Sequence, residues 1–117
     1  MATINKRTFT IRIGDDFVKL LTIADSNDVA IDVSNYSFKM QIRKCKNDAD
    51  AILTLESPTD IDISDGANGN IIINISDVVT NTLDEMNAVY DLKWTTNLGI
   101  ITTIMEGNIQ ILETVTK

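Results

Sequence analysis

The last third of the chain, Asn87–Lys117, places the strongest constraint on the fold. Two runs of alternating apolar and polar residues flank the break at Asn97-Leu98-Gly99, and a second glycine, Gly107, interrupts the later run. Alternation of this kind is typical of half-buried strands, because successive side chains of a strand point to opposite faces. The segment therefore predicts a long hairpin that closes an all-β domain, and we expect the later arm to be bent or bulged at Gly107.

The composition agrees with many short strands joined by turns. Of the 117 residues, 44% are hydrophobic but only 5% are aromatic, and isoleucine dominates the apolar set. Isoleucine and threonine are β-branched and suit a pleated surface, whereas asparagine and aspartate favour turns. The length predicts one domain, residues 1–117, with a core large enough to need no metal or disulfide.

Alternating runs recur along the whole chain at nearly regular spacing. In the clearest of them Phe38, Met40 and Ile42 share one face while Lys39 and Gln41 share the other. The predicted strands cover residues 7–13, 17–23, 36–43, 51–56, 61–63, 70–75 and 88–96, followed by the final arm after residue 99. This pattern favours an immunoglobulin-like antiparallel β-sandwich of seven to eight strands, in which the last arm lies beside the early strands and leaves few free edges.

One short helix is predicted between two of these strands. Ser76 is a suitable N-cap, and Asp77 in the first turn would meet the positive end of the helix dipole. Val79 and Leu83 are four residues apart and would share the buried side.

Charge disfavours two classes of partner. The formal net charge is −7, with a pI near 4.3, so phosphate backbones and anionic membrane surfaces would repel the chain. We interpret the acidity as keeping a β-rich surface soluble, with a partner that seeks acidic groups as the alternative. Met1–Arg7 has no apolar signal core and no run reaches about 20 apolar residues, so we expect synthesis and retention in the cytoplasm unless the protein leaves within a larger assembly.

Cys45 is the only cysteine, which excludes an intrachain disulfide. Its basic neighbours Lys44 and Lys46 would suit a reactive thiol. The chain has no histidine to act as a base, however, so a structural cysteine at a strand end is the favoured interpretation.

The segment Asp60–Gly66 is the best candidate for a metal site. Its aspartates alternate as oxygen ligands do in a calcium loop, but Asp65 stands where that loop needs glycine, and Ile71 stands where it needs glutamate. Ile61 and Ile63 would be buried in a strand, so a strand followed by a turn is favoured and a weak calcium site is the alternative.

Other candidate sites receive less support. Asp15 and Asp16 follow Gly14 and are expected in a solvated turn instead of forming an acid–base pair. Trp94 and Tyr90 would form a sugar-stacking platform if exposed, but both share the core face of their strand. No phosphate-binding glycine loop or pair of catalytic glutamates is recognisable. We therefore expect no enzyme activity, no catalytic residues, no cofactor and no bound metal.

The order of the landmarks resembles a known family. They are Gly14-Asp15, Ala30–Val33, Phe38-x-Met40-x-Ile42-Arg43, Gly69-Asn70-Ile71 before Ser76, Tyr90-Asp91-Leu92, Gly99, Gly107 and Val115-Thr116. In this order they resemble the small immunoglobulin-like domains of tailed-phage and prophage proteins, such as the N-terminal domain of baseplate upper proteins. The resemblance covers nearly the whole chain, but no receptor-binding or coiled-coil extension follows Thr116.

The resemblance implies a non-enzymatic structural protein of the virion tail or baseplate. It would contact other tail or baseplate subunits, form a possible homo-oligomer, and bind neither nucleic acid nor membrane. We expect the arm Met1–Lys6 or the loop Lys44–Asp50 to supply the interface. The alternative function is a carbohydrate-binding or adhesive β-sandwich module, which predicts an exposed Trp94.

Overall fold

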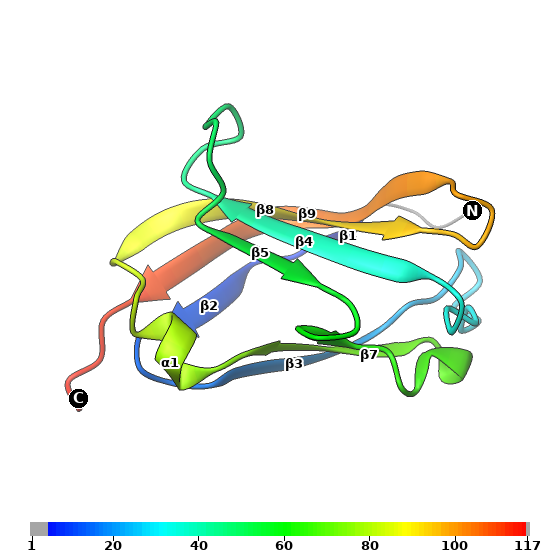
Figure 1. Ribbon diagram of the computed structural model, residues 1–117, viewed down its shortest axis with the longest axis horizontal. Helices are drawn as coiled ribbons and strands as arrows, with labels where there is room; N and C mark the ends of the chain where they lie inside the picture. The colour runs from blue at the N-terminus through cyan, green and yellow to red at the C-terminus, as the bar shows by residue number, and fades with distance from the viewer. Residues whose placement is uncertain (1–4, 117) are drawn as a thin grey trace.

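A computed structural model describes residues 5–116, which form two facing layers of strands (Figure 1). The α-helix α1 has a single turn, Asp77–Thr80, and a 3-10 turn, η1, covers Gly66–Asn68. The strands are β1 (Asn5–Lys6), β2 (Phe9–Arg12), β3 (Phe17–Thr22), β4 (Ser37–Arg43), β5 (Leu53–Glu56), β6 (Ile61–Asp62), β7 (Asn70–Ile75), β8 (Met86–Thr95) and β9 (Ile101–Leu112).

The strand order identifies an immunoglobulin-like sandwich. One layer, here called the large sheet, has the order β1-β9-β8-β4-β5, and β2 also pairs with β9; the other, the small sheet, has the order β3-β7-β6. The large sheet thus has the G-F-C-C′ order of an immunoglobulin variable domain, and the small sheet has its B-E-D order. The predicted fold class is therefore confirmed.

Alternation along the strands builds the core between the sheets. Phe38, Met40 and Ile42 of β4 are buried, as are Ile71 and Ile73 of β7 in the opposite sheet. Removing one isoleucine side chain of this kind from water contributes about 1.5–3 kcal/mol to folding. Within the described residues no buried side-chain polar atom lacks a hydrogen-bond partner. The described core is therefore apolar apart from Thr80, whose hydroxyl is hydrogen-bonded.

The first strands lie against the last one, as expected, but in parallel. The register pairs Phe9 of β2 with Ile109 of β9, and β1 pairs with the same strand nearer the hairpin. In the break between β1 and β2, the amide of Arg7 donates a hydrogen bond to the carbonyl of Glu106 in β9 at 3.1 Å. The expectation of a wholly antiparallel sandwich is thus wrong at this edge, because the chain leaves β2 and crosses directly to the small sheet.

The predicted bulge lies elsewhere than expected. The register between β8 and β9 shifts at Leu92/Lys93, where Met105 and Thr103 are the partners and Ile104 is the extra residue. Gly107 instead pairs regularly with Tyr90, and a Cβ there would collide with the carbonyl oxygen of Arg7. Glycine is required at residue 107 by the close approach of the N-terminal strands.

The short helix α1 forms where it was predicted. The Ser76 hydroxyl accepts a hydrogen bond from the amide of Val79, and Leu83, just past the helix, is buried while Val79 is half-buried. The buried hydroxyl of Thr80 donates to the carbonyl of Asp15 at 2.8 Å and accepts from the amide of Gly14. These bonds attach α1 to the turn that precedes β3.

We expect Gly107→Ala to lower the free energy of unfolding by about 3 kcal/mol, because the new methyl group meets the Arg7 backbone instead of a movable side chain. Gly99→Ala is the matched control: its φ of 83° makes alanine strained but nothing lies near the new methyl group, so about 1 kcal/mol is expected. Urea unfolding of the three proteins measures both losses. Equal losses in the two variants would contradict the close approach.

Candidate interaction surface

The outer face of the large sheet is the broadest described surface that no other strand or helix covers (Figure 1). The polar partners of the alternating core residues lie here, on β4, β8 and β9. Lys39 is opposite Lys93, and Gln41 is opposite Asp91, in the β4–β8 register. The alternation in β4 had already indicated that Lys39 and Gln41 share a face, but only the strand pairing shows that residues from β8 and β9 extend it.

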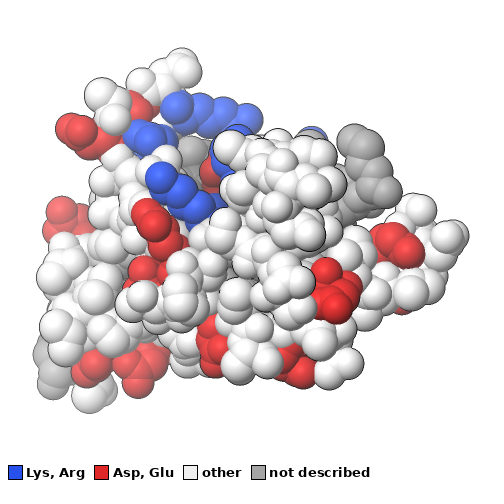
Figure 2. Space-filling view, turned by 45° about the vertical axis from the view of Figure 1, so that its right-hand side comes forward, with Lys and Arg blue, Asp and Glu red and all other residues white. Residues whose placement is uncertain are grey.

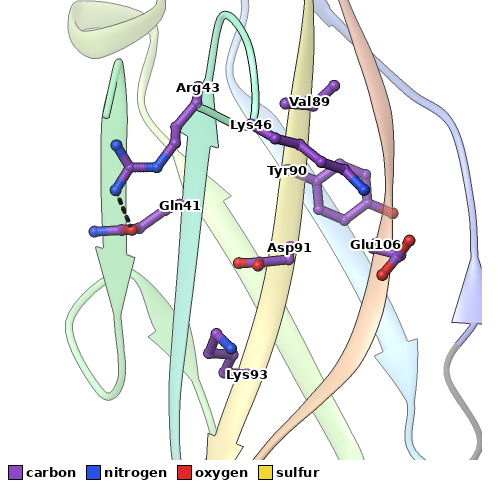
Figure 3. A pocket seen from close by; sticks show the side chains of 8 residues that line it. All are labelled: Gln41, Arg43, Lys46, Val89, Tyr90, Asp91, Lys93 and Glu106. Atoms are coloured by element: carbon purple, nitrogen blue, oxygen red, sulfur yellow. Dashed lines mark hydrogen bonds between the residues drawn. The ribbon is translucent and has the colours of Figure 1, made fainter. Parts of the chain in front are cut away.

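A shallow depression of ≈ 240 Å³ lies on this face between β4, β8 and β9 (Figure 3). The guanidinium of Arg43 donates to the Gln41 side chain at 2.8 Å and to the backbone carbonyl of Asp48 at 2.9 Å. Lys93 donates to the Thr103 hydroxyl at 2.9 Å. The lining residues are Gln41, Arg43, Lys46, Val89, Tyr90, Asp91, Lys93 and Glu106. Such a mixed, open lining suits contact with the side chains of another protein better than enclosure of a small ligand.

Basic side chains gather on this part of an otherwise acidic chain. Figure 2 shows the lysines and arginines close together, with acidic side chains beside them as well as over the rest of that view. Half of the ten basic residues belong to β4, the following loop and β8: Lys39, Arg43, Lys44, Lys46 and Lys93. This concentration of basic groups, with acidic groups among them, would orient a partner that approaches the large sheet.

The tip of the β8–β9 hairpin adds an apolar patch beside the charged face. Leu98, Ile100 and Ile101 are 81%, 58% and 65% exposed. Ile101 also lines a second hollow of ≈ 350 Å³ on the large sheet, together with residues of β4, β5 and β8. The patch and the charged face are therefore continuous. Aliphatic residues exposed together at a loop tip are a usual sign of a contact surface.

Tyr90 anchors the N-terminal strands beneath this face. Its ring is buried against Phe9, with the ring centroids 5.2 Å apart, and its hydroxyl donates to the carbonyl of Arg7 at 2.8 Å. Burial of the ring raises the pKa of the Tyr90 hydroxyl to about 12, although the Arg7 charge acts in the opposite direction. The phenol is thus a structural donor that joins β8 to Arg7, in the short break between β1 and β2.

The aspartates of the Asp60–Gly66 segment serve turns and strand ends. Asp62 accepts from the amide of Ser64, which lowers the pKa of its carboxyl group. Asp65 accepts from the side-chain amides of Asn70 and Asn68, each at 2.7 Å, and these bonds lower its pKa. Asp60 accepts from the amide of Glu56. Ile61 is buried in β6, as the strand interpretation predicted, although β6 has only two residues.

The other candidate residues lie apart from one another. Asp15 and Asp16 occupy an exposed turn before β3, and Asp16 accepts from the amide of Asp77 at 2.7 Å. Cys45 is exposed in the loop after β4. Trp94 is only 7% exposed and packs edge-on against Tyr36 at 5.1 Å between ring centroids, so the core interpretation of this residue is confirmed.

The described residues contain neither a metal-ligand cluster nor a membrane-spanning helix. Among residues 5–116, no three histidine, cysteine, aspartate or glutamate side chains are grouped as metal ligands would be. In the same part of the chain, no helix has the length and apolar character needed to cross a membrane.

Comparisons with known proteins find similar solved structures but no matching family model. No family model matches the sequence, and no curated protein matches it. Among solved structures, murine CRIg is similar with a TM-score of 0.43 and 14% identity, over 92% of each chain. The extracellular domain of the voltage-gated sodium channel beta4 subunit, described as a parallel homodimer with a role in cell-cell adhesion, has a TM-score of 0.42 and 8% identity, over 95% of this chain and 94% of that chain. Both TM-scores are below 0.5, so the fold assignment depends on the strand order instead.

We expect the stability to decline between pH 10 and about 12, because the folded protein holds the Tyr90 proton more tightly than the unfolded chain does. Below pH 10 the phenol is neutral in both states and its contribution is complete; above pH 10 the unfolded chain loses this proton first. Tyr90→Phe should cost about 1 kcal/mol at neutral pH and flatten this decline. Urea unfolding at each pH measures the effect, with Tyr36→Phe as the control, and an identical decline in Tyr90→Phe would contradict the assignment.

Proposed function

We propose that this protein is a non-enzymatic structural protein of a phage or prophage, which joins other subunits of the virion tail or baseplate through protein–protein contacts. The order of sequence landmarks from Gly14 to Thr116 supports the phage assignment. The fold supports the mode of action, because a filled apolar core leaves the sheet faces, loops and edges as the working surfaces. The protein has no catalytic activity and acts in the virion after synthesis in the bacterial cytoplasm.

The observation that carries the contact function is the continuity of the charged face with the apolar hairpin tip. Lys93 lines both hollows of the large sheet, and Ile101 belongs both to the second hollow and to the exposed tip. Interfaces between subunits combine a dehydrated apolar centre with a polar surround, and this surface provides both. Its basic side chains lie among acidic ones, so this surface can pair with charges of both signs on a neighbouring subunit.

The two segments expected at the interface have different surroundings in the structure: one is a free loop and the other is partly paired with a strand. The loop Lys44–Asp50 is exposed throughout and projects from the large sheet (Figure 1), so it remains a candidate for contact. In the N-terminal arm, Asn5 and Lys6 form β1 beside β9, and Met1–Ile4 lie outside the described residues. The interface is therefore assigned to the large sheet with its hairpin tip and loop.

The carbohydrate-binding alternative loses its main support. It required an exposed Trp94 on which a sugar ring could stack, and this side chain lies in the core against Tyr36. We therefore retain the assembly function alone.

The location of the protein tests the assignment directly. Antibodies raised against the domain should label the tail or baseplate of particles induced from the host when these are imaged by electron microscopy. Reading frames for tail or baseplate proteins should flank its gene. Purified particles that lack the protein would overturn the virion assignment.

The contact surface is tested by Ile101→Asp, which places a charge in the apolar part of the proposed interface. We expect incorporation into particles to fall on the order of tenfold, with no loss of thermal stability because residue 101 is 65% exposed. Val78→Asp is the matched control, because Val78 is 71% exposed on α1, away from the large sheet. Quantitative immunoblotting of purified particles measures both variants, and equal incorporation would argue against this surface.

A further inference from the structure

The small sheet ends in a strand whose outer edge has no partner within residues 5–116. β3 pairs with β7 on one side only. In the immunoglobulin arrangement a first strand, A, covers this edge, but here β1 and β2 both pair with β9 of the opposite sheet. The edge of β3 is consequently left open by the same pairing that adds β1 and β2 to the large sheet.

The register shows which backbone groups are free. The amide of Ile23 donates to Gly69, which continues the β3–β7 register, so Leu21, Lys19 and Phe17 also face β7. Because the backbone direction alternates along a strand, the amides and carbonyls of Val18, Leu20 and Thr22 point away from β7. Outside the β3–β7 ladder, no backbone hydrogen bond is found for Phe17–Thr22 among the described residues. Three donors and three acceptors thus line the free edge.

The side chains beside this edge form an apolar stripe. Val18 and Leu20 are 62% and 59% exposed on the outer face of the small sheet. Ile72 of β7 is the direct partner of Leu20 and is half-buried on the same face. Exposed strands in soluble proteins are normally protected by charge, proline or very short length. The outer face of β3 carries neither charge nor proline, and the one charged side chain of the strand, Lys19, lies on its other face.

Acidic residues stand at both ends of the open edge. Asp15 and Asp16 precede β3 and are exposed. Asp25 and Asp28 follow it in the turn that leads away from the sheet. Lys19, the only charged residue within β3, lies on the other face of the strand, with its Nζ 5.8 Å from the Phe9 ring centroid. The edge is therefore apolar in the middle and negative at its two ends.

We propose that the free edge of β3 binds an extended segment of a partner protein by strand addition. The segment supplies backbone donors and acceptors to Val18, Leu20 and Thr22, places alternate apolar side chains beside Leu20 and Ile72, and carries lysine or arginine at both ends. The backbone bonds supply the extended geometry, the apolar stripe supplies burial, and the acidic ends select the charge of the flanks.

A second copy of this chain does not meet these requirements. The antiparallel register that pairs all three free residues with those of another copy has Leu20 opposite Leu20. It places Asp15 of each copy opposite Asp25 of the other, so like charges meet at both ends. The charge pattern therefore favours a partner with basic flanks over self-association through this edge.

This inference extends the proposed assembly function to a second surface, on the opposite sheet from the hairpin tip. It rests on the proposal that the domain works by protein contact, but it does not depend on the phage assignment. Failure of strand addition would leave assembly through the large sheet untouched, because Ile101 and Lys93 take no part in it. The two proposals are therefore tested by separate variants.

Peptide binding to the purified protein tests strand addition. The probe is a synthetic peptide of about ten residues that alternates valine and threonine and ends in two lysines at each side. We expect saturable binding in a fluorescence anisotropy titration. A peptide with glutamates at both ends should bind roughly tenfold more weakly. A lysine-ended peptide methylated on alternate backbone nitrogens, which removes the donors facing β3, should not bind.

Amide hydrogen exchange, followed by NMR, locates the contact on the intact protein. In the free protein, the amides of Val18, Leu20 and Thr22 should exchange quickly while those of Lys19 and Leu21 are protected by β7. Saturating lysine-ended peptide should slow exchange at the three free amides by tenfold or more. Unchanged exchange at these amides despite binding would place the peptide elsewhere and overturn the proposal.

Leu20→Pro removes one outward-facing donor at a position where an edge strand accepts proline, and it should abolish binding of the lysine-ended peptide. Thr54→Pro is the matched control on β5, an edge strand of the large sheet, because the β4–β5 register turns the Thr54 amide away from β4; it should bind the peptide normally. Leu20→Thr keeps the donor and should bind roughly tenfold more weakly, which preserves the test if the proline variant does not fold. Full binding by Leu20→Thr, or protection of the three amides by self-association without peptide, would overturn the proposal.

Discussion

The parallel pairing of β2 with β9 is the constraint on which the rest of the structure depends. It brings residues 100 positions apart in the chain into register, as Phe9 with Ile109 and Ile11 with Ile111. The Tyr90 hydroxyl secures the segment before β2 by its bond to the Arg7 carbonyl, and the missing side chain of Gly107 makes room for the same backbone. A contact between the two ends of a chain is entropically costly, so burial of Phe9 and Ile111 must supply the compensating free energy.

This pairing also decides which surfaces remain available for contact. By joining the N-terminal strands to the large sheet, it covers the edge of β9, and the outer face of this sheet remains charged and bordered by an apolar hairpin tip. By the same step it removes the strand that would have covered β3, and the small sheet keeps an open edge. The two surfaces belong to opposite layers, so one domain can contact two neighbours at once, as a subunit in the interior of an assembly must.

Much of the fold follows from local patterns. The alternation in β4 and in β7 assigned their buried faces correctly, because a side-chain period of two leaves little ambiguity when one face must enter the core. Ser76 marked the start of α1 because its hydroxyl satisfies an amide that no earlier turn can bind. Trp94 was placed in the core for the reason that also removes it as a sugar platform: it shares the Leu92 face.

The predictions that were wrong all concern how segments distant in the chain pair with one another. A glycine within a strand is a common sign of a bulge, and this pattern favours a bulge at Gly107. The bulge lies at Ile104 instead, and glycine is needed at residue 107 because a Cβ there would collide with the Arg7 backbone. The surface formed by Gln41, Arg43, Asp91 and Glu106 could be predicted only in part. The alternation within each strand indicates which residues point outward, but it does not indicate which strands are neighbours.

The amino-acid sequence by itself determined the class of fold, the residues that enter the core, the positions of most strands and turns, and the low charge density along β3. Each of these depends on a few neighbouring residues and on the two-residue period of a strand. Only the tertiary structure decided that the first strands run parallel to the last one, that basic side chains from β4 and β8 meet on one face, and that the edge of β3 is free. Those features depend on which distant strands pair, and pairing is settled by the balance of burial and chain entropy over the whole domain.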